Sequence, residues 1–316
     1  MDAVVGLLDG VRARGAFVLR MKMDPPWSMS IRDEALTLIC QTGGSAVIVG
    51  ESSGTTWLNP GDVALARGTE YYLFADDPGT TPMVVIHPGQ RCTTLSGEDL
   101  RFEMSLGVRT WGNSASGTTT SVICAYEGRS EVSDRLLAAL PAVVVLRSDD
   151  WNSPLVGMLA EEAGLDGPGQ EAYLDRLLDV LLIAVLRAWF DRGENAPTWW
   201  HAERDPVVGR ALKLIYNNPS HPWTVANLAA AVGNSRAVFA RRFTDQVGEP
   251  PIAFLTSWRL AMAADMLRSS RTTIAAIARQ VGYGTPFALS SAFKRAYGVS
   301  PNTYRTDVGA SEATGA

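Results

Sequence analysis

The chain of 316 residues carries 28 Lys and Arg against 33 Asp and Glu, a net charge of −5, and 46% of its residues are hydrophobic. A chain of this length holds two or three domains with full cores. Its start, Met1-Asp2-Ala3, has no cationic segment, so we expect no secretory signal. The three scattered cysteines form no Cys-x-x-Cys pair, which argues against a disulfide framework or a zinc site and predicts a protein of the reducing cytoplasm.

Short apolar runs separated by Gly and Pro turns fill residues 1–130. The runs are rich in Val, Ile, Leu and Thr, and their regular spacing predicts a β-sandwich or β-barrel. The turn and strand from Pro60 to Leu65, Pro-Gly-Asp-Val-Ala-Leu, resemble those typical of cupin barrels. We therefore expect a cupin-like β domain at 1–130. Its expected strands are Ala16–Met21, Leu36–Cys40, Ala46–Val49, Val63–Ala66, Met83–Ile86 and Thr118–Ala125.

Aromatic residues of this predicted barrel are candidates for lining a small-molecule pocket, although aromatic residues on strands more often belong to the core. His87 is the only histidine of the barrel, since the other two are His201 and His221, so a site of two histidines and a carboxylate cannot be assembled. We expect His87 to make a structural hydrogen bond, and we predict no metal, no cofactor and no catalytic residue. The candidate effector-binding residues are Trp27, Trp57, Tyr72 and His87.

Residues 131–193 place apolar side chains at helical spacing. Val132–Leu140, Leu155–Ala163 and Gln170–Phe190 repeat them every three or four residues, which predicts a helical extension for packing or dimerisation. Asp179 and Arg187 interrupt the wide apolar face of the last segment, so we expect no membrane span. Residues 194–205 are interpreted as a linker, in which the region around Trp199 transmits a signal.

Two stretches near the C-terminus repeat each other at an offset of 49 to 50 residues. In the first copy, Thr224 is a good N-cap, and Gly233 supplies the positive φ that ends the helix. Ser235 then caps a second helix, which runs to about Val247. A glycine turn between two short amphipathic helices predicts a helix-turn-helix unit.

The second copy follows the same plan. Thr273 and Thr285 are its caps, Gly282 matches the first turn glycine, and Pro286 stands at the first helical position, where its missing N–H costs nothing. Between the copies, Pro251–Ser269 predicts one amphipathic helix that spans roughly 25 Å. A rigid spacer of that size can hold two recognition helices about one turn of B-DNA apart, roughly 34 Å.

Charge is unevenly distributed along the chain. From Glu203 to Arg305 there are 13 Lys and Arg against 5 Asp and Glu, whereas residues 1–202 have 15 against 26. A net +8 in the last third is the electrostatic footprint expected for binding a phosphate backbone. A solvated basic surface without a partner is the alternative, and the coincidence of basicity with the duplication argues against it.

The run Ile277-Ala-Arg-Gln-Val-Gly-Tyr283, followed by Phe293-Lys-Arg-Ala-Tyr-Gly-Val-Ser-Pro301, closely resembles the signature of the AraC/XylS family of bacterial transcription regulators. The resemblance covers about residues 205–305. It implies a DNA-binding domain at 206–305 with two helix-turn-helix units, a homodimer through the sensor half, and double-stranded DNA as partner. RNA polymerase is a further candidate partner. Residues 306–316 are small and polar and are expected to form a disordered tail.

Carried over by position, the resemblance places Ala237, Ala240 and Arg241 where relatives touch bases. Of these, only Arg241 has hydrogen-bonding reach, and a bidentate contact to guanine is worth about 1–3 kcal/mol of discrimination; a phosphate contact is the alternative. In the second unit the corresponding residues are shorter or apolar, which favours contacts with the DNA backbone or thymine methyls. The residues assigned to DNA are Ser235, Arg236, Ala237, Ala240, Arg241, Thr285, Phe287, Ser290, Ser291 and Lys294.

We interpret the chain as an α+β, multi-domain, cytoplasmic and sequence-specific transcription regulator whose sensor domain binds an unidentified small-molecule effector. Three alternatives stay open. One is a metal-dependent cupin enzyme fused to a DNA-binding module, and another is a redox-sensing regulator that uses Cys92 with Cys40 or Cys124. The third is a nonspecific nucleoid-type binder, which would show steep salt dependence and little sequence preference.

Overall fold

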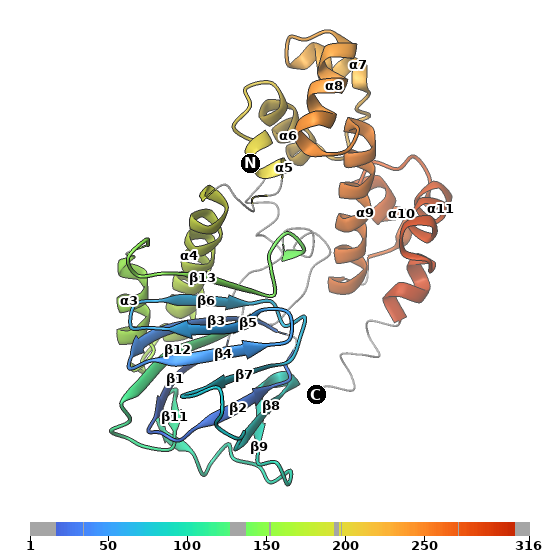
Figure 1. The fold of residues 1–316 in the computed structure, drawn as a ribbon. Helices are drawn as coiled ribbons and strands as arrows, with labels where there is room; N and C mark the ends of the chain where they lie inside the picture. The colour runs from blue at the N-terminus through green and yellow to red at the C-terminus, as the bar shows by residue number, and fades with distance from the viewer. Residues whose placement is uncertain are drawn as a thin grey trace. The chain divides into compact units, whose positions relative to one another are not determined.

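The computed structural model describes residues 17–306 except residues 34, 127–136, 152, 193–195, 197 and 271. The chain divides into two compact units, each described below by itself (Figure 1). One falls within Val11–Gly128 and Leu140–Gly193 and holds the strands, and the other contains the C-terminal helices from Glu194 onward. Most of the predicted helix Val132–Leu140 and of the predicted tail lies outside the described residues.

The N-terminal unit consists of two β-sheets that enclose a common core. Its strands are β1 Phe17–Met23, β2 Ser28–Ile31, β3 Leu36–Gly43, β4 Ala46–Gly50, β5 Gly54–Leu58, β6 Val63–Ala66, β7 Tyr72–Ala75, β8 Val84–His87, β9 Arg91–Thr93, β10 Ser105–Gly107, β11 Thr110–Gly112, β12 Thr119–Tyr126 and β13 Val143–Leu146. The seven-stranded sheet has the order β10-β11-β1-β12-β3-β6-β13, and the six-stranded sheet has the order β5-β4-β7-β2-β8-β9. The predicted cupin-like barrel is confirmed.

Strand register gives the seven-stranded sheet two apolar faces. Leu19, Ile123 and Ile39 are successive partners across β1, β12 and β3, and they face the interior between the sheets. Because side chains alternate along a strand, the neighbouring row that contains Cys124 and Leu38 points to the opposite face. That outer row is also fully buried, so a further layer must cover it.

Two helices supply this layer, α3 Pro154–Glu162 and α4 Gln170–Asp191. Tyr126 at the end of β12 donates a hydrogen bond from its hydroxyl to the carbonyl of Leu178 in α4, over 3.1 Å. The leucines of α4 form its buried stripe, and each one taken from water stabilises the fold by about 1.5–3 kcal/mol. No helix in the described ranges is long and apolar enough to cross a membrane.

The predicted helical extension at 131–193 and the linker at 194–205 both need correction. Val143–Leu146 is a strand, β13, that pairs with β6 at the edge of the seven-stranded sheet. Four consecutive apolar residues are equally compatible with a strand and with a short helix, so the sequence pattern could not distinguish the two. The assigned linker contains helix α5, Thr198–Ala202, in which Trp200 is buried. The side chain of Trp199, to which we assigned signal transmission, lies outside the described part.

The C-terminal unit carries the two predicted helix-turn-helix copies, and all four predicted caps are confirmed. Thr224, Ser235, Thr273 and Thr285 each accept a backbone N–H from the first turn of the helix that follows. Such a cap contributes about 1 kcal/mol. The helices are α6 Val208–Asn217, α7 Val225–Ala231, α8 Arg236–Val247, α9 Pro251–Ser269, α10 Ile274–Gln280 and α11 Pro286–Tyr297.

Helix α9 runs between the helices of the first copy and those of the second (Figure 1). Phe254 in its first half packs on Phe243 of α8, with ring centroids 5.8 Å apart. Leu260 and Leu267 in its second half belong to the cluster that holds Phe293 of α11. Helix α6, which was not predicted, closes the first copy. Its signal was present in Val208, Ala211, Leu212 and Ile215, which repeat at helical spacing and are buried.

Candidate nucleic-acid interface and ligand cavity

Helix α8 presents an unoccupied basic face. Arg236, Ala237 and Arg241 are exposed, and Ala240 is partly exposed beside them. The two arginines make no hydrogen bond or ion pair with any described residue, so their guanidinium groups are available to an outside partner. The hydroxyl oxygen of Ser235 accepts the N–H of Val238 as the N-cap, which fixes where this face begins.

Arg242, the next residue on α8, is half-buried and bound to a neighbouring carboxylate. Its Nε and Nη2 donate to Oδ2 of Asp205 over 3.0 and 2.6 Å. The same carboxylate accepts the N–H groups of Val207 and Val208 and so caps α6. Burial acts to raise the pKa of Asp205, but these hydrogen bonds and the charge of Arg242 lower it below its ordinary value. Arg242 is therefore a structural residue that locks α8 to α6.

Helix α11 presents a less charged face. Phe287 is 80% exposed, which is unusual for a large apolar side chain, while Ser291 and Lys294 are exposed and Ser290 is partly so. Thr285 accepts the N–H of Ala288 as the N-cap. The face therefore offers an aromatic ring and hydroxyls in its first two turns and a cation in its third.

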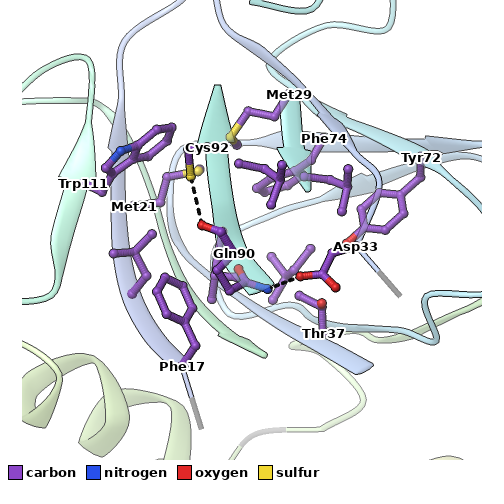
Figure 2. Close-up of a pocket in the computed structure, with 15 residues that line it drawn as sticks. Phe17, Met21, Met29, Asp33, Thr37, Tyr72, Phe74, Gln90, Cys92 and Trp111 are labelled. Atoms are coloured by element: carbon purple, nitrogen blue, oxygen red, sulfur yellow. Dashed lines mark hydrogen bonds between the residues drawn. The ribbon is translucent and has the colours of Figure 1, made fainter. Parts of the chain in front are cut away.

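A cavity lies between the two sheets of the N-terminal unit (Figure 2). The space inside it that a water-sized sphere can reach is about 40 Å³, so its wall has to open around any guest larger than a water molecule. Most of its wall is apolar. Figure 2 shows polar side chains gathered at one end, while aromatic and methionine side chains line the rest: Phe17, Met21, Met29, Phe74 and Trp111.

The polar end is built around Asp33, which is only 7% exposed. Its Oδ2 accepts the amide N–H of Gln90 over 2.5 Å, and its Oδ1 accepts the backbone N–H of Ala35 over 3.0 Å. Gln90 has φ 59 in the left-handed region, which costs a residue other than glycine roughly 1–2 kcal/mol. Thr37 and Tyr72 line the same end, and burial raises the pKa of the Tyr72 phenol.

Of the four predicted effector residues, only Tyr72 lines this cavity. Trp27 is fully buried in the core, in edge contact with Phe74 at 5.2 Å between centroids, and Trp57 is 43% exposed on β5. His87 is bound through Nε2 to the Thr93 hydroxyl over 2.9 Å, so the predicted structural hydrogen bond is confirmed. Trp27, Trp57 and His87 do not line this cavity, because side chains alternate along a β-strand and the sequence period does not tell which face of a sheet borders a cavity.

Asp33 and Gln90 were not predicted. Neither belongs to a strand, and nothing in their local sequence distinguishes them from ordinary loop residues. They meet only because β2 and β8 pair in parallel, which brings the chain after Ile31 close to the turn after His87. The signal for this contact is strand pairing over more than fifty residues.

The cysteines are all free thiols in protonation-favouring surroundings. Burial raises the pKa of Cys40 to about 12 and the pKa of Cys92 to about 11, and it raises that of Cys124 as well. Cys92 lines the cavity, whereas the other two lie under α4 on the outer face of the sheet. Because the thiolate is the reactive form, these surroundings disfavour oxidation chemistry at Cys92. Within the described ranges, no group of three His, Cys, Asp or Glu is placed to hold a metal.

Comparison with protein families gives two matches. A family model described as Cupin matches residues 2–191, more than half of the chain. A model described as a helix-turn-helix domain matches residues 228–307. The two matches divide the chain in the same order as the strand-rich and helical units of the structure.

Several proteins are similar to this chain. Two putative AraC-like transcription regulators, from Streptomyces antibioticus and Streptomyces lividans, are 46% and 43% identical over 132 residues, 42% of this chain. The match spans less than half of their length, 44% and 43%. The HTH-type transcriptional regulator AlkR from Acinetobacter baylyi is 27% identical over 96% of this chain and 99% of its own. Among solved structures, the DNA-binding domain of AdpA in complex with a target DNA is 30% identical, covering 34% of this chain and 95% of that one, with a TM-score of 0.32.

Proposed function

The chain belongs to the AraC/XylS family of DNA-binding transcription regulators with an N-terminal cupin domain, and from this we propose that it regulates transcription by binding a specific sequence in double-stranded DNA. The reading helices are α8 and α11. The observation that carries the proposal is a pair of exposed arginines on α8, Arg236 and Arg241, which bond to no described residue, whereas the adjacent Arg242 is bonded to Asp205.

The two helices contribute differently. Arg241 reads a guanine in the major groove, where its planar fork matches the O6 and N7 acceptors. Ala237 and Ala240 leave room for the bases beside it. On α11, Phe287 packs on thymine methyls and Lys294 lies at a phosphate, while Ser290 and Ser291 contact the backbone. The capping residues Ser235 and Thr285 keep their hydroxyl protons for phosphate oxygens, and Arg236 binds a phosphate at the edge of the site.

The cupin domain is the sensor half of this proposal. Its cavity takes a small-molecule effector, and binding shifts the protein toward or away from the DNA-competent state by no more than the difference in affinity for the two states. The regulator works in the cytoplasm as a homodimer through the sensor half, with RNA polymerase as a further partner. The exposed apolar side chains of Tyr173 and Val180 on α4, 46% and 50% exposed, support a protein contact there.

Selection of the full-length protein against random duplex DNA at near-physiological salt tests the proposal. We expect enrichment of two sequence elements about one helical turn apart, one of them containing a guanine that depends on Arg241. A single short element would reduce α11 to a backbone contact. Binding without enrichment, with a steep dependence on salt, would contradict sequence-specific reading and favour the nucleoid-type alternative.

A further inference from the structure

The carboxylate of Asp33 is an acidic group buried at the polar end of the cavity. The residue is over nine-tenths buried and borders the cavity, and each of its two carboxylate oxygens accepts one N–H group. The two donors, from Ala35 and Gln90, are neutral amides. Among the described residues, no Lys, Arg or His nitrogen forms an ion pair with Asp33. Buried charges are normally paired, so this end of the cavity is electrostatically incomplete.

The remaining wall limits what can complete it. Aromatic rings and two methionines line the cavity away from Asp33, and Met side chains adapt to the shape of an apolar guest. A polyol would leave most of its hydroxyls without partners in such a site, and an anion would meet the charge of Asp33. A guest with an apolar body and one cationic end satisfies both parts of the cavity.

The Gln90 amide occupies the place that the cationic end of such a guest would take. Its side-chain amide reaches Asp33 from a backbone in the left-handed region, and the preceding Gly89 also has positive φ, at 73°. An ammonium group carries three donors, and the Thr37 and Tyr72 oxygens that line the same end are acceptors for the two that Asp33 leaves over. A charged donor also binds a carboxylate more strongly than a neutral amide does.

From this arrangement we propose that the effector of the sensor domain is an apolar amine, whose ammonium group displaces the Gln90 amide and pairs with Asp33. The inference rests on the proposed sensor role of the cavity. The amine can bind Asp33 only when the Gln90 amide leaves it. The interaction between Gln90 and Asp33 therefore competes with the amine and weakens its binding. The turn Pro88–Gln90 is the part of the wall that changes when the cavity is occupied.

Three probes with the same aromatic body and different heads test the proposal: phenethylamine, phenethyl alcohol and phenylacetate. Their affinities for the full-length protein are measured by titration calorimetry near neutral pH. We expect the amine to bind at least about tenfold more tightly than the alcohol and phenylacetate to show no binding, because only the ammonium group forms a charge-assisted bond to Asp33. An alcohol that binds as tightly as the amine, or an amine that does not bind at millimolar concentration, would overturn the proposal.

Variants assign the effect to Asp33. Asp33→Asn keeps the shape and one acceptor oxygen but removes the charge, so the preference for the amine should disappear while the alcohol affinity stays within about twofold. Asp77→Asn, which removes an exposed carboxylate of the same domain, is the matched control and should change neither. Persistence of the amine preference in Asp33→Asn would contradict the role of that carboxylate.

Two changes at Gln90 keep the test decisive if Asp33→Asn does not fold. Gln90→Ala should tighten amine binding severalfold, because no amide has to be displaced. Gln90→Lys should block the amine, because its own ammonium group pairs with Asp33; unchanged amine affinity in both variants would contradict the exchange. Success in the DNA selection with failure of all three probes would reject this ligand class and leave DNA recognition standing.

Discussion

Arg241 and Arg242 are consecutive residues of one helix with opposite surroundings. The guanidinium group of Arg242 makes two hydrogen bonds to Asp205, while that of Arg241 extends into solvent without a partner among the described residues. An arginine with five donors and no internal acceptor costs side-chain entropy when it is ordered, and it gains from that ordering only when it meets a ligand. Arg242 therefore holds α8 in place, while Arg241, one residue before it, stays available to a partner outside the fold.

Alanine substitution of each arginine should separate the two effects. We expect Arg241→Ala to lose about 1–3 kcal/mol of discrimination at one base pair and to unfold at the wild-type temperature. We expect Arg242→Ala to lower the unfolding temperature of the C-terminal unit, because Asp205 loses its charged partner, and to keep the base preference of the protein it leaves folded. Affinity across a set of single-base operator variants, measured beside thermal unfolding, checks both. Uniform weakening at every base in Arg241→Ala would assign Arg241 to a phosphate.

Phe287 allows a test at the level of one methyl group. An aromatic ring that is 80% exposed on a reading helix gains by covering the methyl of thymine. Replacing that thymine by uracil removes only the methyl, and we expect a loss of about fourfold in affinity, equivalent to one buried CH₂ group. In Phe287→Ala the same DNA change should have no effect. If uracil is tolerated at every position of the second element by the wild-type protein, Phe287 does not read thymine.

The recognition-helix residues could be predicted from the sequence, whereas the cavity residues could not. Exposed recognition residues follow from helix caps a few positions away, so their faces were predictable from Ser235 and Thr285. The cavity residues Asp33 and Gln90 come together only through strand pairing between distant segments, which a single sequence does not specify. Local signals therefore predicted the exposed faces of α8 and α11, to which we assign DNA binding, but they did not predict the cavity.

The two helix-turn-helix copies have the same order of helices and turns, but their turns differ in how tightly they are packed. Gly233 and Gly282 both have positive φ, 70° and 87°. A Cβ at Gly233 would meet nothing within 4 Å, whereas one at Gly282 would lie 2.7 Å from Ser220 Cα and 2.7 Å from Nη2 of Arg259. Arg259 is itself anchored, since it donates to the Pro219 and His221 carbonyls. The second turn is therefore part of the packing between the copies.

Alanine at each turn should measure this difference. Both substitutions carry the cost of a left-handed backbone, roughly 1–2 kcal/mol. Gly282→Ala adds a clash with backbone that cannot move cheaply, so we expect it to destabilise the C-terminal unit by at least about 1 kcal/mol more than Gly233→Ala. Thermal unfolding of the two variants, followed by the helical signal, provides the comparison. Equal shifts would show that the chain around Ser220 yields without cost.

The elements also show where sequence patterns stop being informative. Helix bounds in the C-terminal unit follow from caps and glycines, and α9 begins and ends where its apolar period predicted, at Pro251 and Ser269. Val143–Leu146 gave no such information, because four consecutive apolar residues suit a strand and a helix equally. Only the free edge of β6 makes this run a strand, and that edge is a property of the folded sheet.

Charge is divided unevenly between the two parts of the chain. The basic excess of +8 lies between Glu203 and Arg305, in the unit that holds both reading helices, while residues 1–202 carry −11. The acidic half adds no attraction for phosphates, so DNA binding depends on the C-terminal unit. Within that unit, α9 packs against both copies, which fixes the distance between α8 and α11. The operator must match this distance.

Changing the spacing of the two operator elements tests whether one C-terminal unit reads both. Inserting half a helical turn, about five base pairs, places the elements on opposite faces of the duplex, and we expect affinity to fall at least about tenfold as one set of base contacts is lost. Inserting a full turn should not restore it, because α9 cannot lengthen. Elements bound by separate protomers through a flexible connection would recover affinity with the full turn. Electrophoretic mobility shifts with the three spacings distinguish these outcomes, and recovery at the full turn would assign the two elements to two copies of the chain.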